Sequence, residues 1–192
     1  MSFIIGLDLG QSADFSALCV LEQTETTSGW REYTCRGLKR WPLGTAYTRI
    51  VADLGTDLFR EPLAGSALVV DASGVGRPVV DMIRKVRLPA QLAPVVITAG
   101  QSQSFADGYH HVAKVILIST VQVLLEQRRL TLPKNHPLID VTLKEFANYR
   151  VKVTPAANET FSARDGEHDD LVLAVAIAAW YGERGQRRLK LW

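Results

Sequence analysis

Residues 2–21 read SFIIGLDLGQSADFSALCVL, and this stretch decides how the chain begins to fold. Two runs of aliphatic and β-branched residues flank a short segment of Gly, Ser and Asp, a pattern that predicts a β-hairpin. Asp8 stands inside the first run, between Leu7 and Leu9. A buried, ionised carboxylate costs on the order of several kcal/mol unless a cation or a donor compensates it. The hairpin therefore predicts two strands and an acidic group that needs a partner.

The rest of the chain alternates between strand-like and helical patterns. Short apolar runs predict strands at 30–41, 67–71, 93–98 and 130–133. Apolar spacings of three and four predict helices at 45–59 and 114–129, and further helices are expected at 74–86, 137–149 and 169–182. Residues 100–111 are expected to form a functional loop, and residues 150–154 with 160–163 a second β-hairpin close to the acidic residues. With no repeat or linker, residues 1–192 are predicted to form one α/β domain, a mixed sheet flanked by helices, with a flexible tail at 183–192.

The composition is that of an ordinary globular protein, expected to be soluble. Of 192 residues, 47% are hydrophobic and 22% charged, and no apolar run reaches the roughly 18 residues of a membrane span. The N-terminus lacks the basic segment of a signal peptide, so secretion is not expected. Cys19 and Cys35 have no CxxC spacing and are expected to be buried, reduced thiols. The net charge of +2 does not indicate nucleic-acid binding through charge alone.

Acidic residues fall where three buried elements begin or end. Asp8 lies in the first strand, Asp71 ends the strand at 67–71, and Asp169 and Asp170 begin the last helix. Carboxylates with few His or Cys candidates favour Mg²⁺ or Mn²⁺ over Zn²⁺. A shared carboxylate can hold two such ions about 4 Å apart for phosphodiester chemistry. The pattern therefore indicates hydrolysis of a nucleic-acid backbone.

Each of these acids also has a purely structural interpretation. Asp8 can be paired with a cation in the core, and Asp71 can cap the turn that follows it. Asp169 or Asp170 can be an N-cap that the helix dipole stabilises. Their joint spacing, more than any one of them, favours a functional site.

Three segments resemble the nuclease motifs of phage terminase large subunits. These are GLDLGQSAD (residues 6–14), VDASGVG with VVD (residues 70–76 and 79–81) and HDDLVLAVA (residues 168–176). Lys114 with residues 124–133 also resembles the family's connecting helix and strand. The resemblance implies a ribonuclease H-like fold and two-metal cleavage of double-stranded, concatemeric phage DNA during genome packaging. It also implies a small terminase subunit, a portal protein and an ATPase motor domain as partners, in the cytoplasm of a bacterial host.

Carried over residue by residue, the resemblance gives each acid a role. Asp8 would bridge two Mg²⁺ or Mn²⁺ ions, Asp71 would bind one, and Asp169 or Asp170 would complete the other. Many relatives carry a further acid one helical turn later, where this chain has Leu173. A site short of one carboxylate is expected to work better with Mn²⁺ than with Mg²⁺. No GxxxxGK[ST] motif is present, so the sequence shows no ATPase motor of its own.

Several basic residues are candidate DNA contacts. Lys114 can reach the scissile phosphate or balance the carboxylates, and Arg150, Lys152 and Arg164 are expected on or beside the second hairpin, where they could follow a DNA backbone. His168 can position water, although packing is the simpler interpretation.

Three other functions remain open from the sequence. A Holliday-junction resolvase shares the expected fold and acids but cleaves four-way junctions. The segment DLGQS (residues 8–12) also resembles the phosphate loop of actin-like ATPases, which need two such domains. Finally, Leu173 is compatible with a non-catalytic interaction domain that has lost a metal site.

Overall fold

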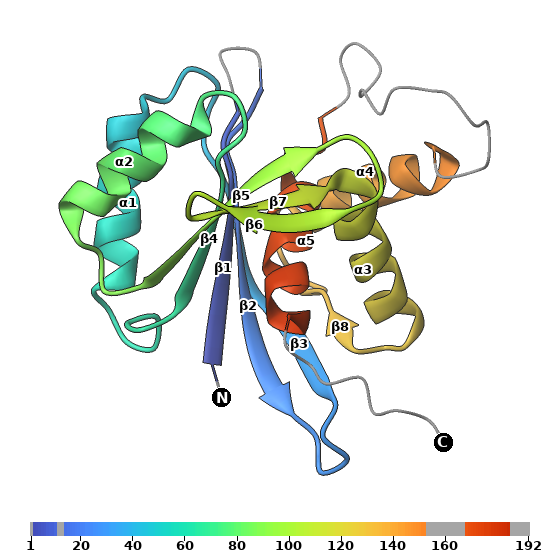
Figure 1. Ribbon diagram of the computed structural model, residues 1–192. Helices are drawn as coiled ribbons and strands as arrows, with labels where there is room; N and C mark the ends of the chain where they lie inside the picture. Colours follow the sequence, from blue (N-terminus) through green and yellow to red (C-terminus); the bar gives the residue numbers. More distant parts are fainter. Residues whose placement is uncertain (1, 11–13, 153–167, 185–192) are drawn as a thin grey trace.

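The fold is built on one mixed β-sheet (Figure 1). The computed structural model describes residues 2–10, 14–152 and 168–184, and within these ranges eight strands follow the order β6-β7-β5-β4-β1-β2-β3-β8. The strands are β1 (Ser2–Asp8), β2 (Ala17–Glu25), β3 (Arg31–Arg40), β4 (Ala67–Asp71), β5 (Gln91–Thr98), β6 (Gln103–Ala106), β7 (Tyr109–Ala113) and β8 (Leu130–Thr131). β1, β2 and β3 form an antiparallel meander, whereas β1, β4, β5 and β7 run parallel. The predicted hairpin and mixed sheet are both confirmed.

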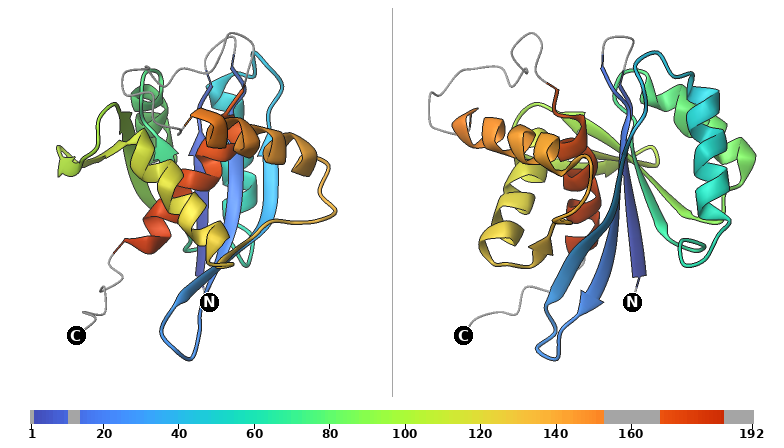
Figure 2. Two further views of the ribbon diagram at one scale, coloured as in Figure 1. Left: turned by 90° about the vertical axis from the view of Figure 1, so that its right-hand side faces the viewer. Right: turned by 180° about the vertical axis from the view of Figure 1, so that it is seen from behind.

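Five helices cover the two faces of the sheet. They are α1 (Tyr47–Leu58), α2 (Gly76–Val86), α3 (Lys114–Glu126), α4 (Ile139–Lys152) and α5 (Asp170–Glu183). Figures 1 and 2 show α1 and α2 on one face and α3, α4 and α5 on the other. Each helix was predicted to within a few residues at its ends. None of the helices in the described part of the chain is long and apolar enough to cross a membrane.

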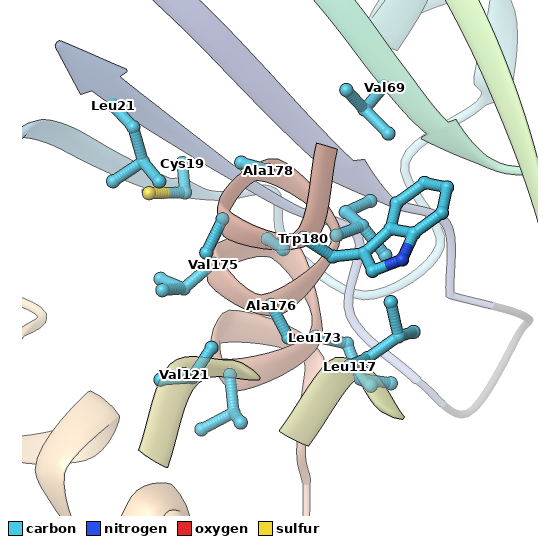
Figure 3. Close-up of a cluster of buried hydrophobic side chains, with 14 of the residues drawn as sticks. Cys19, Leu21, Val69, Leu117, Val121, Leu173, Val175, Ala176, Ala178 and Trp180 are labelled. Atoms are coloured by element: carbon cyan, nitrogen blue, oxygen red, sulfur yellow. The ribbon is translucent and has the colours of Figure 1, made fainter. Parts of the chain in front are cut away.

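Helix α5 is the centre of its layer. Almost all its residues are buried, because β1 and β2 contact it on one side and α3 and α4 on the other. A helix that is apolar all round is buried all round, and this explains the uninterrupted apolar run after the two aspartates. Figure 3 shows Val175, Ala176 and Ala178 of α5 among side chains from the sheet and α3. A Cβ on Gly6 of β1 would lie 1.9 Å from the Ala174 carbonyl oxygen, so glycine is required for this close approach.

The sheet divides the core into two apolar layers. Ile5 and Leu7 of β1 pack with α1 and α2, whereas Ile4 packs with α3 and α5. The predicted buried thiols lie in the layer that contains α3 and α5. The Sγ atoms of Cys19 and Cys35 are 3.7 Å apart, within hydrogen-bonding distance, and form no disulfide.

Two local predictions were wrong. Residues 103–113, expected within or next to a loop, form the hairpin β6–β7 at the sheet edge. Asp107 and Gly108 both have positive φ and connect the paired residues Ala106 and Tyr109, as a two-residue type I′ turn requires. Residues 150–152, expected in a strand, continue α4 because no Gly or Pro interrupts the helix there. The rest of that predicted hairpin, 153–167, and the tail at 185–192 lie outside the described residues.

Candidate metal centre

Two aspartates end neighbouring strands at the same edge of the sheet. β1 and β4 are parallel, and Leu7 lies opposite Val70 in the ladder. The next residue on each strand is an aspartate, Asp8 on β1 and Asp71 on β4. Their side chains are only 7% and 9% exposed. The strand register therefore brings two buried carboxyl groups together from positions 63 residues apart in the sequence (71 minus 8).

The same alternation that builds the core points these acids toward α5. Side chains two residues apart on a strand share a face, so Asp8 shares the face of Ile4, and Asp71 that of Val69. Ile4 and Val69 both belong to the apolar layer that contains α5. Asp169, the N-cap residue of α5, begins the helix at this end. Three separate elements thus converge on one acidic cluster.

The electrostatic environment of Asp8 is that of a buried acid among other acids. Burial raises the pKa of Asp8 well above its ordinary value. Three neighbouring carboxylates, Asp71, Asp169 and Asp170, raise this pKa further, and Asp71 also shares a hydrogen bond with Asp8. These acidic neighbours do not match the structural interpretation of Asp8, which was an ion pair with a cation in the core. Instead, Asp8 lies where a cation would be strongly stabilised.

Asp71 holds the turn that follows it and also lies beside Asp8. Its Oδ1 accepts the backbone N–H of Ser73 at 2.8 Å, which fixes the turn between β4 and α2. Burial raises the pKa of Asp71, while hydrogen bonds from Ser73 and Asp8 and the positive charge of Lys114 act in the opposite direction. The turn contact uses one carboxylate oxygen and still leaves Asp71 beside Asp8.

Asp169 is held by a lysine from another helix. The Lys114 Nζ atom, at the first residue of α3, lies 2.8 Å from Asp169 Oδ2. The Asp169 side chain makes no N-cap hydrogen bond, although the residue occupies the N-cap position of α5. Lys114 therefore balances charge in the acidic cluster, one of its two predicted roles.

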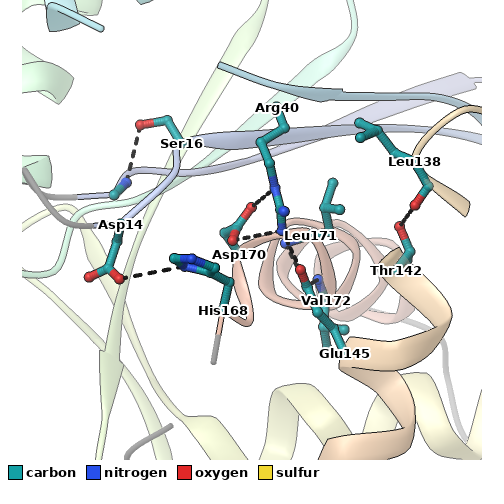
Figure 4. Close-up of polar contacts among 11 residues, drawn as sticks. Asp14, Ser16, Arg40, Leu138, Thr142, Glu145, His168, Asp170, Leu171 and Val172 are labelled. Atoms are coloured by element: carbon teal, nitrogen blue, oxygen red, sulfur yellow. Dashed lines mark hydrogen bonds and ion pairs between the residues drawn. The ribbon is translucent and has the colours of Figure 1, made fainter. Parts of the chain in front are cut away.

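Asp170 is bound differently from its neighbour (Figure 4). Arg40, at the end of β3, donates from Nε to Asp170 Oδ2 at 2.7 Å and from Nη2 to Oδ1 at 2.9 Å. The same Nη2 contacts Glu145 of α4, whose other oxygen accepts the backbone N–H groups of Leu171 and Val172 at 3.1 Å each. Glu145 thus provides the N-terminal cap of α5 that neither aspartate side chain provides.

The sequence interpretation missed Arg40 and Glu145. Arg40 is 130 residues from Asp170 and 105 residues from Glu145 in the sequence, so no local spacing reveals these contacts. One signal was present: Glu145 shares the inward face of α4 with Thr142 and Phe146. An acid on the buried face of a helix indicates a buried partner.

The other predicted site residues have varied positions. The His168 Nδ1 atom lies 3.9 Å from Asp14 Oδ1, and the His168 ring packs against Phe15, in agreement with a packing role (Figure 4). Arg150 and Lys152 lie in α4 and not on a hairpin, because the helix continues to Lys152. Arg164 lies outside the described residues.

Leu173, at the position where many relatives have an acid, belongs to the core. It is 7% exposed and packs in the same apolar layer as Leu117 of α3 (Figure 3). Its backbone N–H donates to the Asp169 carbonyl at 2.9 Å, so it lies one helical turn beyond that residue.

An open hollow of about 280 Å³ adjoins the turn that follows Asp8. It is lined by Gly10, Asp14, Ser16, Pro42 and residues 44–47. The Tyr47 hydroxyl donates to the Gly10 carbonyl at 2.9 Å and so ties this turn to the start of α1.

The donor set fits a hard divalent cation. Its oxygens are all carboxylate oxygens, the ligands that Mg²⁺ and Mn²⁺ prefer. Within residues 2–10, 14–152 and 168–184, no three acidic, His or Cys side chains already stand in a metal-binding arrangement. Burial raises the pKa of Asp8 and the neighbouring carboxylates raise it further, so an arrangement in which a cation separates these acids would be favourable.

The chain is similar in sequence to a phage packaging protein. It is 25% identical over 176 residues to the terminase large subunit of Thermus phage G20c, an alignment that covers 92% of this chain and 31% of the relative. The chain thus spans about a third of the length of the curated relatives it matches. No family model matches it.

The chain is also similar to solved nuclease domains. The large terminase nuclease of thermophilic phage G20c superposes with a TM-score of 0.67 at 23% identity, over 95% of this chain and 82% of that one. The human cytomegalovirus terminase nuclease domain, soaked with Mn, superposes with a TM-score of 0.57 at 13% identity, over 95% of this chain and 85% of that one. The large terminase nuclease domain of bacteriophage SPP1, with bound Mn, superposes with a TM-score of 0.53 at 11% identity, over 93% of this chain and 85% of that one. The ribonuclease H-like fold and the resemblance to terminase large subunits, both predicted from the motifs, are confirmed.

Proposed function

We propose that this chain, which shares the fold of large terminase nuclease domains, is a metal-dependent endonuclease that cleaves double-stranded DNA. The observation that carries the proposal is the convergence of Asp8, Asp71 and Asp169, two of them buried at the ends of adjacent strands and the third at the start of α5. Buried acids that repel one another are destabilising unless a cation compensates them. The presence of these acids in a fold shared with nuclease domains supports a catalytic centre more than a purely structural cluster of acids.

Asp8, Asp71 and Asp169 are the residues that would hold Mg²⁺ or Mn²⁺, two ions per site. Asp8 is central because the other acids surround it, and it is the candidate for the shared ligand. When bound, two such ions supply an activated water and stabilise the charge that develops on the phosphate. Lys114 keeps Asp169 in place and lowers the net charge of the cluster. The Ser73 amide fixes the orientation of Asp71.

The substrate we propose is concatemeric phage DNA, cut during genome packaging in the bacterial cytoplasm. The relative from Thermus phage G20c is a terminase large subunit, and this chain matches one part of it. An ATPase motor, a small terminase subunit and a portal protein are the proposed partners. Lys114, Arg150, Lys152 and Arg164 are the proposed phosphate contacts, Lys114 being the one that lies beside the acids.

Plasmid cleavage tests the proposal. The wild-type chain is expected to nick or linearise supercoiled plasmid with Mn²⁺ or Mg²⁺ and to be inactive in EDTA. Asp8→Asn and Asp71→Asn should each remove cleavage. Asp81→Asn is the matched control, because Asp81 is an exposed aspartate paired with Arg84 on α2. Undiminished cleavage in EDTA would contradict the proposal.

A four-way junction, offered in the same assay, separates the two nuclease interpretations. We expect linear duplexes and plasmids to be cut at least as well as junctions. A strong preference for the junction would instead favour a resolvase. If the chain cuts neither substrate but binds ATP, the actin-like interpretation would be favoured.

A further inference from the structure

We infer that Arg40, acting with Glu145, is a positioning residue that assigns different roles to the two adjacent aspartates of α5: it holds Asp170 so that Asp169 is the one that serves the metal centre. The inference rests on the proposed function and adds residues to it that the acidic motifs do not contain. Neither Arg40 nor Glu145 touches the proposed reaction site directly. Both act through the N-terminus of α5.

The two aspartates make different contacts, although the charges of both act on Asp8. Asp170 is the first residue of α5, whereas Asp169 is the N-cap residue with a non-helical backbone conformation, so their carboxylates leave the chain in different directions. Asp169 contacts Lys114, whose charge also acts on Asp71. Asp170 contacts Arg40 on the β3 side. The rotation of α5 about its axis therefore decides which aspartate serves the site.

Arg40 fixes this rotation with a bidentate contact. Its guanidinium donates to both oxygens of Asp170, at 2.7 and 2.9 Å, a planar pairing that defines direction as well as distance. The Arg40 side chain is 13% exposed, and its Cζ lies 4.7 Å from the centre of the Phe15 ring. The packed guanidinium has little freedom to follow Asp170 elsewhere. Asp170 is thereby kept in this contact and away from a metal ion at Asp8.

Glu145 fixes the helix end itself. One of its oxygens contacts Arg40, and the other accepts the second and third N–H groups of α5, those of Leu171 and Val172. A helix leaves its first four N–H groups without partners inside the helix, and here a neighbouring helix satisfies two of them. The three side chains connect β3, α4 and α5 at one point, as Figure 4 shows.

The charge balance makes Arg40 the critical member. Asp170 and Glu145 are each 5% exposed, and a single arginine serves both. Removing Arg40 leaves Asp170 and Glu145 buried without the cation that both of them contact. Asp170 would then be free to turn toward the same cation as Asp169, and α5 would lose its fixed orientation.

Mn²⁺ titration of purified full chains tests the inference without relying on activity. Calorimetry gives the Mn²⁺ dissociation constant, and melting in EDTA measures the fold alone. Arg40→Gln is expected to weaken Mn²⁺ affinity about tenfold or more, roughly within the 10- to 100-fold range of residues that orient ligands. Arg40→Lys, which keeps the charge but loses the planar fork, should fall between Arg40→Gln and wild type. Glu145→Gln supplies a milder second variant if Arg40→Gln does not fold.

The two aspartates give the decisive contrast. Asp170→Asn keeps an amide oxygen that can still accept from Arg40, so it is expected to bind Mn²⁺ within about threefold of wild type, whereas Asp169→Asn should bind at least about tenfold more weakly. Arg49→Gln is the control, because Arg49 forms an exposed pair on α1, on the other side of the sheet from α5. It should change neither the affinity nor the melting temperature appreciably.

Each outcome decides the inference. If the Arg40 and Glu145 variants melt lower but bind Mn²⁺ like wild type, these residues are merely structural and the inference fails. If Asp170→Asn loses Mn²⁺ as fully as Asp169→Asn, the assignment of the two aspartates is wrong. If the wild type binds Mn²⁺ in the expected pattern but cuts no DNA, the inference stands and the proposed nuclease function fails. A wild type that binds no Mn²⁺ overturns both.

Discussion

At the scale of single residues, the defining feature is a buried carboxyl group whose nearest charged neighbours are other carboxyl groups. Asp8 could be predicted from the sequence because an aspartate inside an apolar strand needs a reason to be there. Asp71 followed from its place at the end of the apolar strand predicted at 67–71. Arg40 could not be predicted, because its contact with Asp170 depends on how β3 and α5 meet, and no sequence spacing encodes that.

The repulsion between these acids predicts an unusual stability effect. In EDTA, Asp8→Asn and Asp71→Asn are each expected to leave the melting temperature unchanged or to raise it, because one repelling charge disappears. The amide oxygen introduced by Asp71→Asn could still accept the Ser73 backbone N–H, so the turn should persist. Adding Mn²⁺ should raise the melting temperature of the wild type and have little effect on either variant. A lower melting temperature together with lost circular dichroism would identify these acids as structural.

Leu173 gives a second prediction at this scale. Leu173→Asp places a carboxylate in the apolar layer between α5 and α3, and we expect it to destabilise the fold by several kcal/mol, on the order of the cost of an uncompensated buried charge. Leu143→Asp is the control, since Leu143 of α4 is half exposed. Chemical denaturation measures both. A stable Leu173→Asp protein with improved Mg²⁺-dependent cleavage would show that position 173 reaches the metal. The expected preference of the wild type for Mn²⁺ over Mg²⁺ stays a prediction, which cleavage rates with each metal would test.

At the scale of elements, apolar periodicity was sufficient where an element buries one face or all of its faces. Apolar spacing located α1 and α3, and short apolar runs located the central strands, because burial dictates the composition of these elements. It failed at the sheet edge, where β6 is exposed throughout and carries no apolar alternation. The Asp107-Gly108 turn was the available signal for that hairpin. The end of α4 was missed because residues 150–152 were assigned to a strand, although no Gly or Pro ends the helix before them.

The contact between β1 and α5 predicts the effect of one added methyl group. Gly6→Ala would place a Cβ 1.9 Å from the Ala174 carbonyl, so β1 and α5 must separate. We expect a loss of about 1–3 kcal/mol or more, as for other overpacked cores. The shift would also move Asp169 away from Asp8 and weaken Mn²⁺ binding. Gly37→Ala on β3, where a Cβ would meet nothing within 4 Å, is the control for equilibrium denaturation. Equal stability of the two variants would contradict the close packing.

At the scale of the whole molecule, the sheet determines where the chemistry lies. Both apolar layers share the same strands, which supports the proposal that residues 1–192 form one domain. Parallel β1 and β4 end at one edge, and α5 begins at that edge, so the acids of three distant segments meet there. The motifs predicted this meeting through a family resemblance. The topology explains it physically, because Asp8 and Asp71 lie side by side only when β1 and β4 are neighbours in the sheet.

The most direct test of the account is a crystal structure of the chain soaked in Mn²⁺, with anomalous scattering recorded to locate the metal. The account predicts Mn²⁺ peaks in contact with the carboxylates of Asp8, Asp71 and Asp169, at the roughly 2.0–2.6 Å of oxygen ligands to hard divalent cations. It also predicts that Asp170 stays paired with Arg40. Saturating Mn²⁺ with no peak at Asp8, and with the hydrogen bond between Asp8 and Asp71 intact, would contradict the central claim.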